Sequence, residues 1–323
     1  MLTNPLTTVL LAVAVVFAVV KGLNDGASLV AVTSAGISLM PLAAVLTLGG
    51  ALVVGPLLMG TRVATTFAIG LVPAHDASGR LSFLIGISAA MAVSALLATR
   101  GLPTSLTMAI VGGLAGAGAG SGLPVAWSTV AIVVAVGLGA PLLAGVVASL
   151  VLSGLGRLPR GRSTQSRLRW LNYSSFGLQA LAYSANDGQS MLAVFAVAVS
   201  GTSAVEAHLP ELTVLAVAFC TGAVLGLGRV GRSLTRALVL TGPADGIAAE
   251  LASTASAFAA RAFGAPVSMT QTMTAGLAGA RTTAGLRRVR WERAARLMTA
   301  WVSTLPLSAF VGAAVAVSVG ALR

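Results

Sequence analysis

The chain has 323 residues, of which 56% are hydrophobic and only 9% are charged. Soluble domains carry about 25% charged residues, so this composition excludes an ordinary water-facing surface. The net charge of +12 does not indicate nucleic-acid binding, because aromatic residues make up only 5% of the chain and no basic helix stands apart from the apolar runs. Apolar runs of about 20 residues recur without the alternation of barrel strands. We therefore predict an all-α polytopic protein of the cytoplasmic membrane, embedded in lipid.

The first half begins with an apolar run that we interpret as a membrane helix. Residues 1–4 carry no basic side chain and no small-residue cleavage site follows, which argues against a signal peptide. The elements predicted after it are a helix over 6–34 interrupted near 22–26, a helix over 39–59, a short segment over 61–71, a polar loop over 73–79, a span over 81–98, a proline-containing element over 101–108, a glycine-rich stretch over 112–120 and a span over 126–152.

The second half repeats this plan after a basic break. Its predicted elements are a span over 178–199, a span over 212–227, a basic connection over 229–236, a small-residue helix over 242–263, a proline-containing element over 264–271, a glycine-rich stretch over 276–279 and a span over 297–320. We accordingly divide the chain into a first membrane repeat (1–152), a basic cytoplasmic linker (153–169) and a second membrane repeat (170–323). Arginines cluster in this linker and again over 281–296, and the positive-inside rule places both clusters in the cytoplasm.

Two unrelated motifs recur at almost one spacing. Asn24-Asp25 returns as Asn186-Asp187 after 162 residues, and Pro103 returns as Pro266 after 163. A duplicated membrane chain with interrupted helices at matching positions is typical of secondary transporters, whose site lies between the repeats near the middle of the membrane. The sequence therefore predicts one site built from both halves.

The two Asn-Asp pairs carry the strongest functional signal. An aspartate in the bilayer costs about 2.5–3.5 kcal/mol on insertion scales, so it is seldom there without a partner or a task. A structural hydrogen bond is the simpler interpretation, but the repetition favours a function. Carboxylate and amide oxygens suit a hard cation such as sodium, or a carboxylate can hold a transported proton. Asn24, Asp25, Asn186 and Asp187 are the predicted cation-coupling residues.

The proline-containing elements predict helix starts at membrane depth. Unpaired backbone groups are tolerated there only where they line a cavity or bind a ligand, and a helix N-terminus offers N–H donors and partial positive charge to an anion. Hydroxyl and amide side chains follow both prolines, and a lone hydroxyl would ordinarily bond its own backbone. The predicted anion-binding residues are Thr104, Ser105, Thr107, Ser268, Thr270 and Gln271.

Other polar residues have simpler explanations. Glu250 could pair with an arginine, and His75 and His208 lie in loop-like stretches. The glycine-rich stretches lack the strand and lysine of a phosphate-binding P-loop, and close helix packing explains them better. No His/Glu metal cluster or Ser-His nucleophile pattern appears in the spans, so we expect a protein that is not an enzyme and has no cofactor.

Taken together, these motifs resemble the signature elements of the inorganic phosphate transporter family, the low-affinity phosphate permeases and sodium–phosphate symporters. The resembling stretches are Gly-Leu-Asn-Asp-Gly-Ala at 22–27, Gly-Leu-Pro-Thr-Ser at 101–105, Ala-Asn-Asp-Gly-Gln at 185–189 and Pro-Val-Ser at 266–268. The resemblance implies two inverted repeats with broken helices and re-entrant helical hairpins, commonly in a homodimer that moves phosphate with sodium or protons. It also implies that the Asn-Asp pairs bind the cation, with sodium at Asp25 and Asp187, and that hairpin hydroxyls contact phosphate.

The chain departs from the family pattern within both hairpins. Leu106 and Met269 replace the central threonines, and Met108 and Gln271 replace the histidines that usually follow. Ser190 replaces a lysine after the second Asn-Asp pair. Related sulfate permeases also depart in the hairpins, so sulfate is the rival substrate. We expect a phosphate symporter that works by alternating access, with a sulfate permease, a passive anion channel or a non-transporting sensor as the alternatives.

Overall fold

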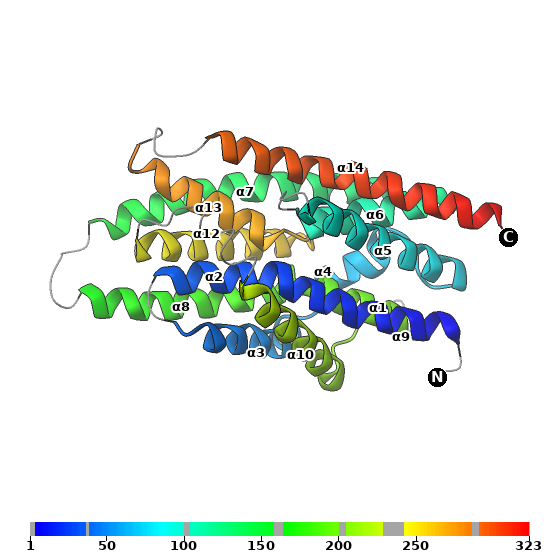
Figure 1. The fold of residues 1–323 in the computed structure, drawn as a ribbon, viewed down its shortest axis with the longest axis horizontal. Helices are drawn as coiled ribbons and strands as arrows, with labels where there is room; N and C mark the ends of the chain where they lie inside the picture. Colours follow the sequence, from blue (N-terminus) through cyan, green and yellow to red (C-terminus); the bar gives the residue numbers. More distant parts are fainter. Residues whose placement is uncertain are drawn as a thin grey trace.

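The protein was analysed as a computed structural model that describes residues 4–36, 39–99, 104–157, 164–199, 205–228, 242–285 and 291–322. These described residues form helices joined by short turns and contain no strand (Figure 1). The all-α prediction is therefore confirmed. Pro103, the connection over 229–236 and the arginines at 160, 162, 287, 288 and 290 lie outside the described residues.

The first half holds seven α-helices and two π-helical turns among its described residues. They are α1 (Pro5–Lys21), η1 (Gly22–Gly26), α2 (Ala27–Gly36), α3 (Pro41–Met59), α4 (Arg62–Thr65), η2 (Thr66–Gly70), α5 (Ala77–Thr99), α6 (Leu106–Gly120) and α7 (Trp127–Leu155). The predicted interruption near 22–26 is a π-helical turn rather than a chain break, so α1, η1 and α2 form one continuous rod. Such turns in α-helices are frequent at functional sites.

The second half has a true break where the first half has the π-helical turn. Its helices are α8 (Thr164–Ala185), α9 (Gln189–Val199), α10 (Leu209–Gly226), α12 (Pro243–Ala262), α13 (Met269–Thr282) and α14 (Trp291–Ala321). Residues 186–188 form the turn between α8 and α9. Because α7 continues to Leu155 and α8 starts at Thr164, both ends of the segment predicted as a linker are helical. The division into two repeats stays a prediction.

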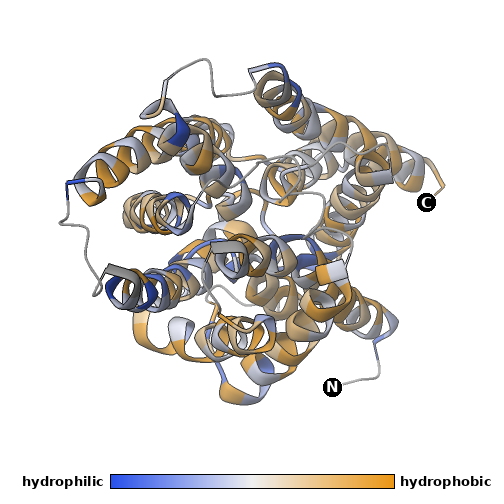
Figure 2. Cartoon of the chain, turned by 60° about the vertical axis from the view of Figure 1, so that its left-hand side comes forward, coloured by the Kyte–Doolittle hydropathy of each residue, from blue (hydrophilic) through white to orange (hydrophobic). Residues whose placement is uncertain are grey.

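Within the part of the chain that the structure describes, six helical segments are long and apolar enough to cross a membrane. They are 5–34, Pro41–Met59, Ala77–Thr99, Trp127–Leu155, Leu209–Gly226 and Ala294–Ala321. Large apolar side chains such as Leu58, Leu142 and Phe310 are exposed on these helices, and Figure 2 shows hydrophobic residues along the peripheral helices. Water would disfavour such a surface, whereas lipid tails cover it without cost. α12 and α13 are rich in Ser, Thr and Ala and lie among the other helices.

The helices that carry the two Asn-Asp motifs run in opposite directions. In Figure 1 the chain passes from right to left through α1 and α2, and from left to right through α8 and α9. The basic ends of α7, α8, α13 and α14 gather at the left, away from both marked termini. One cytoplasmic side for both arginine clusters is consistent with this placement. Opposite directions are what an inverted repeat requires, and the inversion itself remains a prediction that they favour.

Of the polar loop predicted over 73–79, residues 73–76 are a loop, whereas 77–79 form the first turn of α5, which Asp76 caps. The backbone N–H of Gly79 donates to Asp76 Oδ1 at 2.8 Å, and the Ser78 hydroxyl donates to Oδ2 at 2.9 Å. These donors favour the ionised carboxylate, so they hold the pKa of Asp76 below its ordinary value. The charge also complements the positive end of the α5 helix dipole.

Each of the two short helices α6 and α13 packs against the last helix of the other half. α6 lies along α5 and α14, whereas α13 lies along α12 and α7. Glycines make the α6–α14 contact close: a Cβ atom at Gly112 would lie 2.2 Å from the carbonyl oxygen of Leu305, and one at Gly116 would lie 2.0 Å from that of Ala309. Close backbone approach through small residues is the usual way for membrane helices to associate. The glycine-rich stretch over 112–120 is therefore a packing surface, as predicted.

Substitution of Gly116 by Leu should destabilise the protein, because the new side chain would push α14 off α6. We expect a loss of about 1–3 kcal/mol, typical of overpacking, measured as a lower temperature of thermal unfolding in detergent. Gly139→Leu on α7 is the matched control, since no atom lies within 4 Å of a Cβ at that position. Equal melting of both variants would contradict the proposed contact.

Candidate functional site

The two Asn-Asp motifs meet through a lysine. The Lys21 ammonium lies 2.9 Å from Asp25 Oδ2 and 2.5 Å from Asp187 Oδ1. Lys21 and Asp187 are completely buried, and Asp25 is 2% exposed. Lys21 closes α1 and Asp25 follows one turn later in η1, so their four-residue spacing puts both on one face. Asp187 comes from the α8–α9 turn. The structure thus brings Asp25 and Asp187 to one ammonium that the chain itself supplies, and a cation-coupling role for the two motifs stays a prediction.

Asp187 also receives donors from both short helices. The Thr107 hydroxyl in the first turn of α6 donates to Asp187 Oδ1 at 2.7 Å. The backbone N–H of Met269, the first residue of α13, donates to Oδ2 at 3.0 Å. Free N–H groups and partial positive charge at a helix N-terminus favour an anion. The helix starts that the sequence predicts for an oxyanion therefore already hold a carboxylate of the protein.

Asp25 sits in a smaller set of partners. The Asn24 side-chain amide donates to Asp25 Oδ1 at 2.8 Å, and the Tyr183 hydroxyl lies 3.4 Å from Oδ2. The Tyr183 ring is also 5.8 Å from the Lys21 ammonium, within the range of a cation–π contact. Asn24 and Asp25 thus form a local pair, and Tyr183 from α8 completes the side of the cluster that faces the second half.

Asn186 has a different position from its counterpart Asn24. Its side-chain amide donates to the carbonyl oxygens of Ala257 and Ala265, both at 3.1 Å, and its Oδ1 accepts the Val267 N–H at 2.7 Å. The side chain is completely buried. These three bonds tie the α8–α9 turn to α12, through Ala257, and to the segment that leads into α13, through Ala265 and Val267. In this geometry Asn186 fixes the place of the α13 N-terminus, and its oxygen is already used.

The predicted hairpin hydroxyls lie at the two helix starts but do not share one contact. Ser105 caps α6, with its Oγ accepting the Met108 N–H at 3.3 Å. Ser268 and Thr270 bond each other at 3.0 Å at the start of α13. Thr104 and Gln271 are buried beside these residues. Of the six predicted anion ligands, Thr107 is the one that contacts the charged cluster directly; a role in substrate binding stays a prediction for all six.

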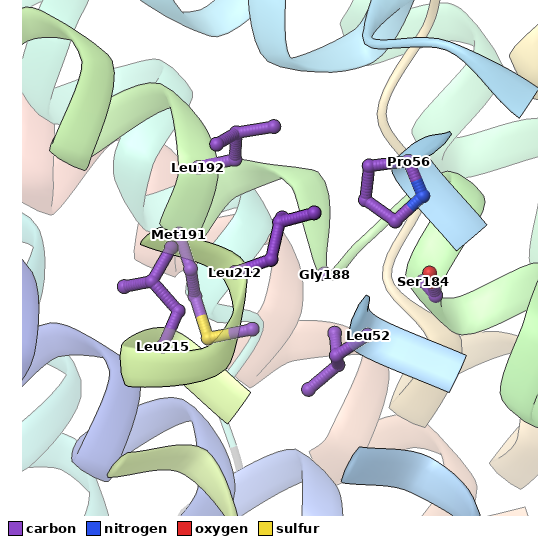
Figure 3. A pocket seen from close by; sticks show the side chains of 8 residues that line it. All are labelled: Leu52, Pro56, Ser184, Gly188, Met191, Leu192, Leu212 and Leu215. Carbon is purple, nitrogen blue, oxygen red and sulfur yellow. The ribbon is translucent and has the colours of Figure 1, made fainter. Parts of the chain in front are cut away.

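A small pocket lies beside the α8–α9 turn and not at the charged cluster. Figure 3 shows Ser184, near the end of α8, and Gly188 of the turn among apolar side chains from α3, α9 and α10. The lining residues are Leu52, Pro56, Ser184, Gly188, Met191, Leu192, Leu212 and Leu215. A mainly apolar lining offers an oxyanion no adequate donors, so this pocket does not fit the predicted substrate.

Comparison with known proteins agrees with the motifs. The phosphate transporter family model matches residues 21–176 and 156–312. A Mycobacterium bovis protein named "probable low-affinity inorganic phosphate transporter" is 33% identical to this chain, and the alignment covers 95% of this chain and 76% of that protein. A Rhizobium meliloti protein of the same name is 29% identical to this chain, and the alignment covers 97% of this chain and 96% of that protein.

The chain belongs to the phosphate transporter family. A solved structure titled "The sodium-dependent phosphate transporter" has the same fold, with a TM-score of 0.76 over 98% of this chain and 100% of that one, at 16% sequence identity. Membership in this family makes the chain a multi-pass transporter of the plasma membrane rather than an enzyme.

The sequence alone assigns no role to three buried residues of this transporter. Lys21 joins the two aspartates and is the sole lysine of the chain. Tyr183 lies against Lys21 and Asp25. Gln189 was not singled out, yet its side chain accepts the Ala64 N–H at 2.9 Å and donates to the Gly60 carbonyl at 2.7 Å. A single lysine at the end of an apolar run is the sequence signal that could have identified Lys21.

Replacing Asn186 by Ala should destabilise the transporter far more than replacing Asn24 by Ala. The first change leaves three buried backbone groups without partners, and an unsatisfied buried group costs about 1–3 kcal/mol. We expect Asn186→Ala to lower the free energy of unfolding by at least about 2 kcal/mol. Thermal unfolding in detergent measures the difference. Similar melting of the two variants would show that Asn186 does not hold the α13 segment.

Proposed function

We propose that this protein is a secondary active transporter that moves inorganic phosphate across the plasma membrane by alternating access. The observation that carries the proposal is that both helix starts donate to Asp187, which Lys21 links to Asp25 of the first Asn-Asp motif. The two halves share this site. If one half rocked against the other, the site would open first to one side of the membrane and then to the other. Family membership supplies the substrate class. The homodimer implied by the resemblance stays a prediction.

Phosphate would bind at the start of α6 and α13. The Thr107 hydroxyl and the Met269 N–H are the donors that point into the cluster, with Ser105, Ser268 and Thr270 beside them. An entering oxyanion would compete with the Asp187 carboxylate for these donors. Since hydrogen phosphate has a proton to donate, it can also bond to a carboxylate, which sulfate cannot do. Retention of both aspartates therefore supports phosphate over sulfate.

Coupling to a cation gradient would act through Asp25 and Asp187. Two buried carboxylates and one ammonium leave an excess of negative charge at membrane depth, which is costly without compensation. A proton or a metal cation that moves with phosphate would lower this cost. The Asn-Asp pairs were predicted as the cation site, with sodium or a proton as the coupling ion.

Uptake of labelled phosphate and labelled sulfate into proteoliposomes tests the proposal. We expect concentrative phosphate uptake under a cation gradient, and loss of the gradient should remove the accumulation. Asp25→Asn and Asp187→Asn should each lower the uptake rate at least about tenfold, the factor that corresponds to 1.4 kcal/mol. Ser78→Ala, in the exposed cap of α5, is a control expected to keep the wild-type rate.

The same assay separates the alternatives. Faster uptake of sulfate than of phosphate would identify a sulfate permease. Equilibration without accumulation would identify a passive channel, and binding without flux a sensor. Wild-type rates in both aspartate variants would remove the charged cluster from the transport mechanism.

A further inference from the structure

Lys21 occupies the position at which a coupling sodium ion would have to bind. Its ammonium contacts carboxylate oxygens from both halves, at 2.9 Å and 2.5 Å. A sodium ion between Asp25 and Asp187 would need the same oxygens and would lie against a fixed positive charge. With no exposed surface on Lys21, the side chain has no route to move its charge into water. The two carboxylates therefore do not fit sodium while Lys21 is in place.

We infer that Lys21 is a tethered cation that replaces sodium between Asp25 and Asp187, so that phosphate transport by this protein does not require sodium. The inference rests on the proposed transport function and adds its ion specificity. A mobile sodium ion enters from one side, neutralises the carboxylates and leaves on the other. An ammonium held on α1 does the neutralising but cannot leave.

The surroundings of the ammonium agree with a permanent occupant. The Tyr183 ring faces it at 5.8 Å, and the two aspartates supply its close oxygen contacts. The amide oxygen next to Asp187, which could complete the oxygen shell of a sodium ion, is engaged elsewhere, because Asn186 Oδ1 accepts the Val267 N–H. The cluster is built for a cation that brings its own N–H donors.

Removal of the ammonium should create a sodium site. Lys21→Gln replaces a positive donor by a neutral side chain with a carbonyl oxygen, and it frees both carboxylates. We expect saturable binding of radiolabelled sodium to detergent-purified Lys21→Gln, none to the wild type, and none to the double variant Lys21→Gln/Asp25→Asn. Arg80→Gln is the matched control, because it removes a part-buried cation that contacts Thr7 and Ala198 outside the cluster. It should bind no sodium.

Transport gives a second and independent readout. In proteoliposomes at fixed pH, wild-type phosphate uptake should be equal in sodium chloride and in choline chloride. Uptake by Lys21→Gln should be low in choline and rise about tenfold in sodium, as expected when sodium is present at about ten times its dissociation constant.

Several results would overturn the inference. They are stimulation of wild-type uptake by sodium, saturable sodium binding to the wild type, and a folded Lys21→Gln variant that binds no sodium. Equal loss of phosphate uptake by Lys21→Gln in both salts would also overturn it, because Lys21 would then act on phosphate itself. If the wild type takes up no phosphate in any salt, the proposed function fails, while the sodium-binding comparison still decides the role of Lys21.

Discussion

The contact of one ammonium with two carboxylates is the interaction on which the rest of the structure depends. Isolated charges at membrane depth are costly, and breaking a buried pair costs about 3–5 kcal/mol. Lys21 and Asp25 form an ion pair within the first half, whereas Asp187 of the second half takes its cation from the first, so the second half depends on the first for the pairing of its charge. The helix starts of α6 and α13 add their donors to Asp187. Electrostatics thus holds together two halves that lipid would otherwise solvate separately.

The two Asn-Asp motifs are similar in sequence but differ in structure. The first lies in a π-helical turn that leaves the rod continuous, and the side chain of Asn24 donates to its neighbour Asp25. The second lies at a break, where Asn186 bonds backbone groups of the α12–α13 region. The backbone groups between α12 and α13 are not paired within a helix and need partners at membrane depth. The side chain of Asn186 supplies these partners, so its role in this structure is structural. The cluster is correspondingly asymmetric, with its cation supplied by the first half alone.

Hydropathy and motif spacing predicted most of the fold, and the cost of an aspartate in the bilayer singled out Asp25 and Asp187 as candidate site residues. Apolar runs located α3, α5, α7, α10 and α14, and the costly aspartates pointed to the centre of the site. The start of α8 was missed because its first residues are polar and basic, as at Arg167 and Arg169, and resemble a loop. The bonds of Asn186 and the bridging role of Lys21 depend on contacts across more than 70 residues of chain, which local periodicity cannot reveal.

The close contact between α6 and α14 has a consequence for biosynthesis. The surface of α6 that holds Gly112 and Gly116 has its partner in α14, and α7 and the other helices of the second half lie between them in the sequence. Chains emerge from the ribosome N-terminus first, so α6 must wait, with its glycine surface uncovered, until α14 has been made and inserted. The first short helix therefore reaches its final packing only after the helices of the second half are in the membrane, and the first half does not mature on its own.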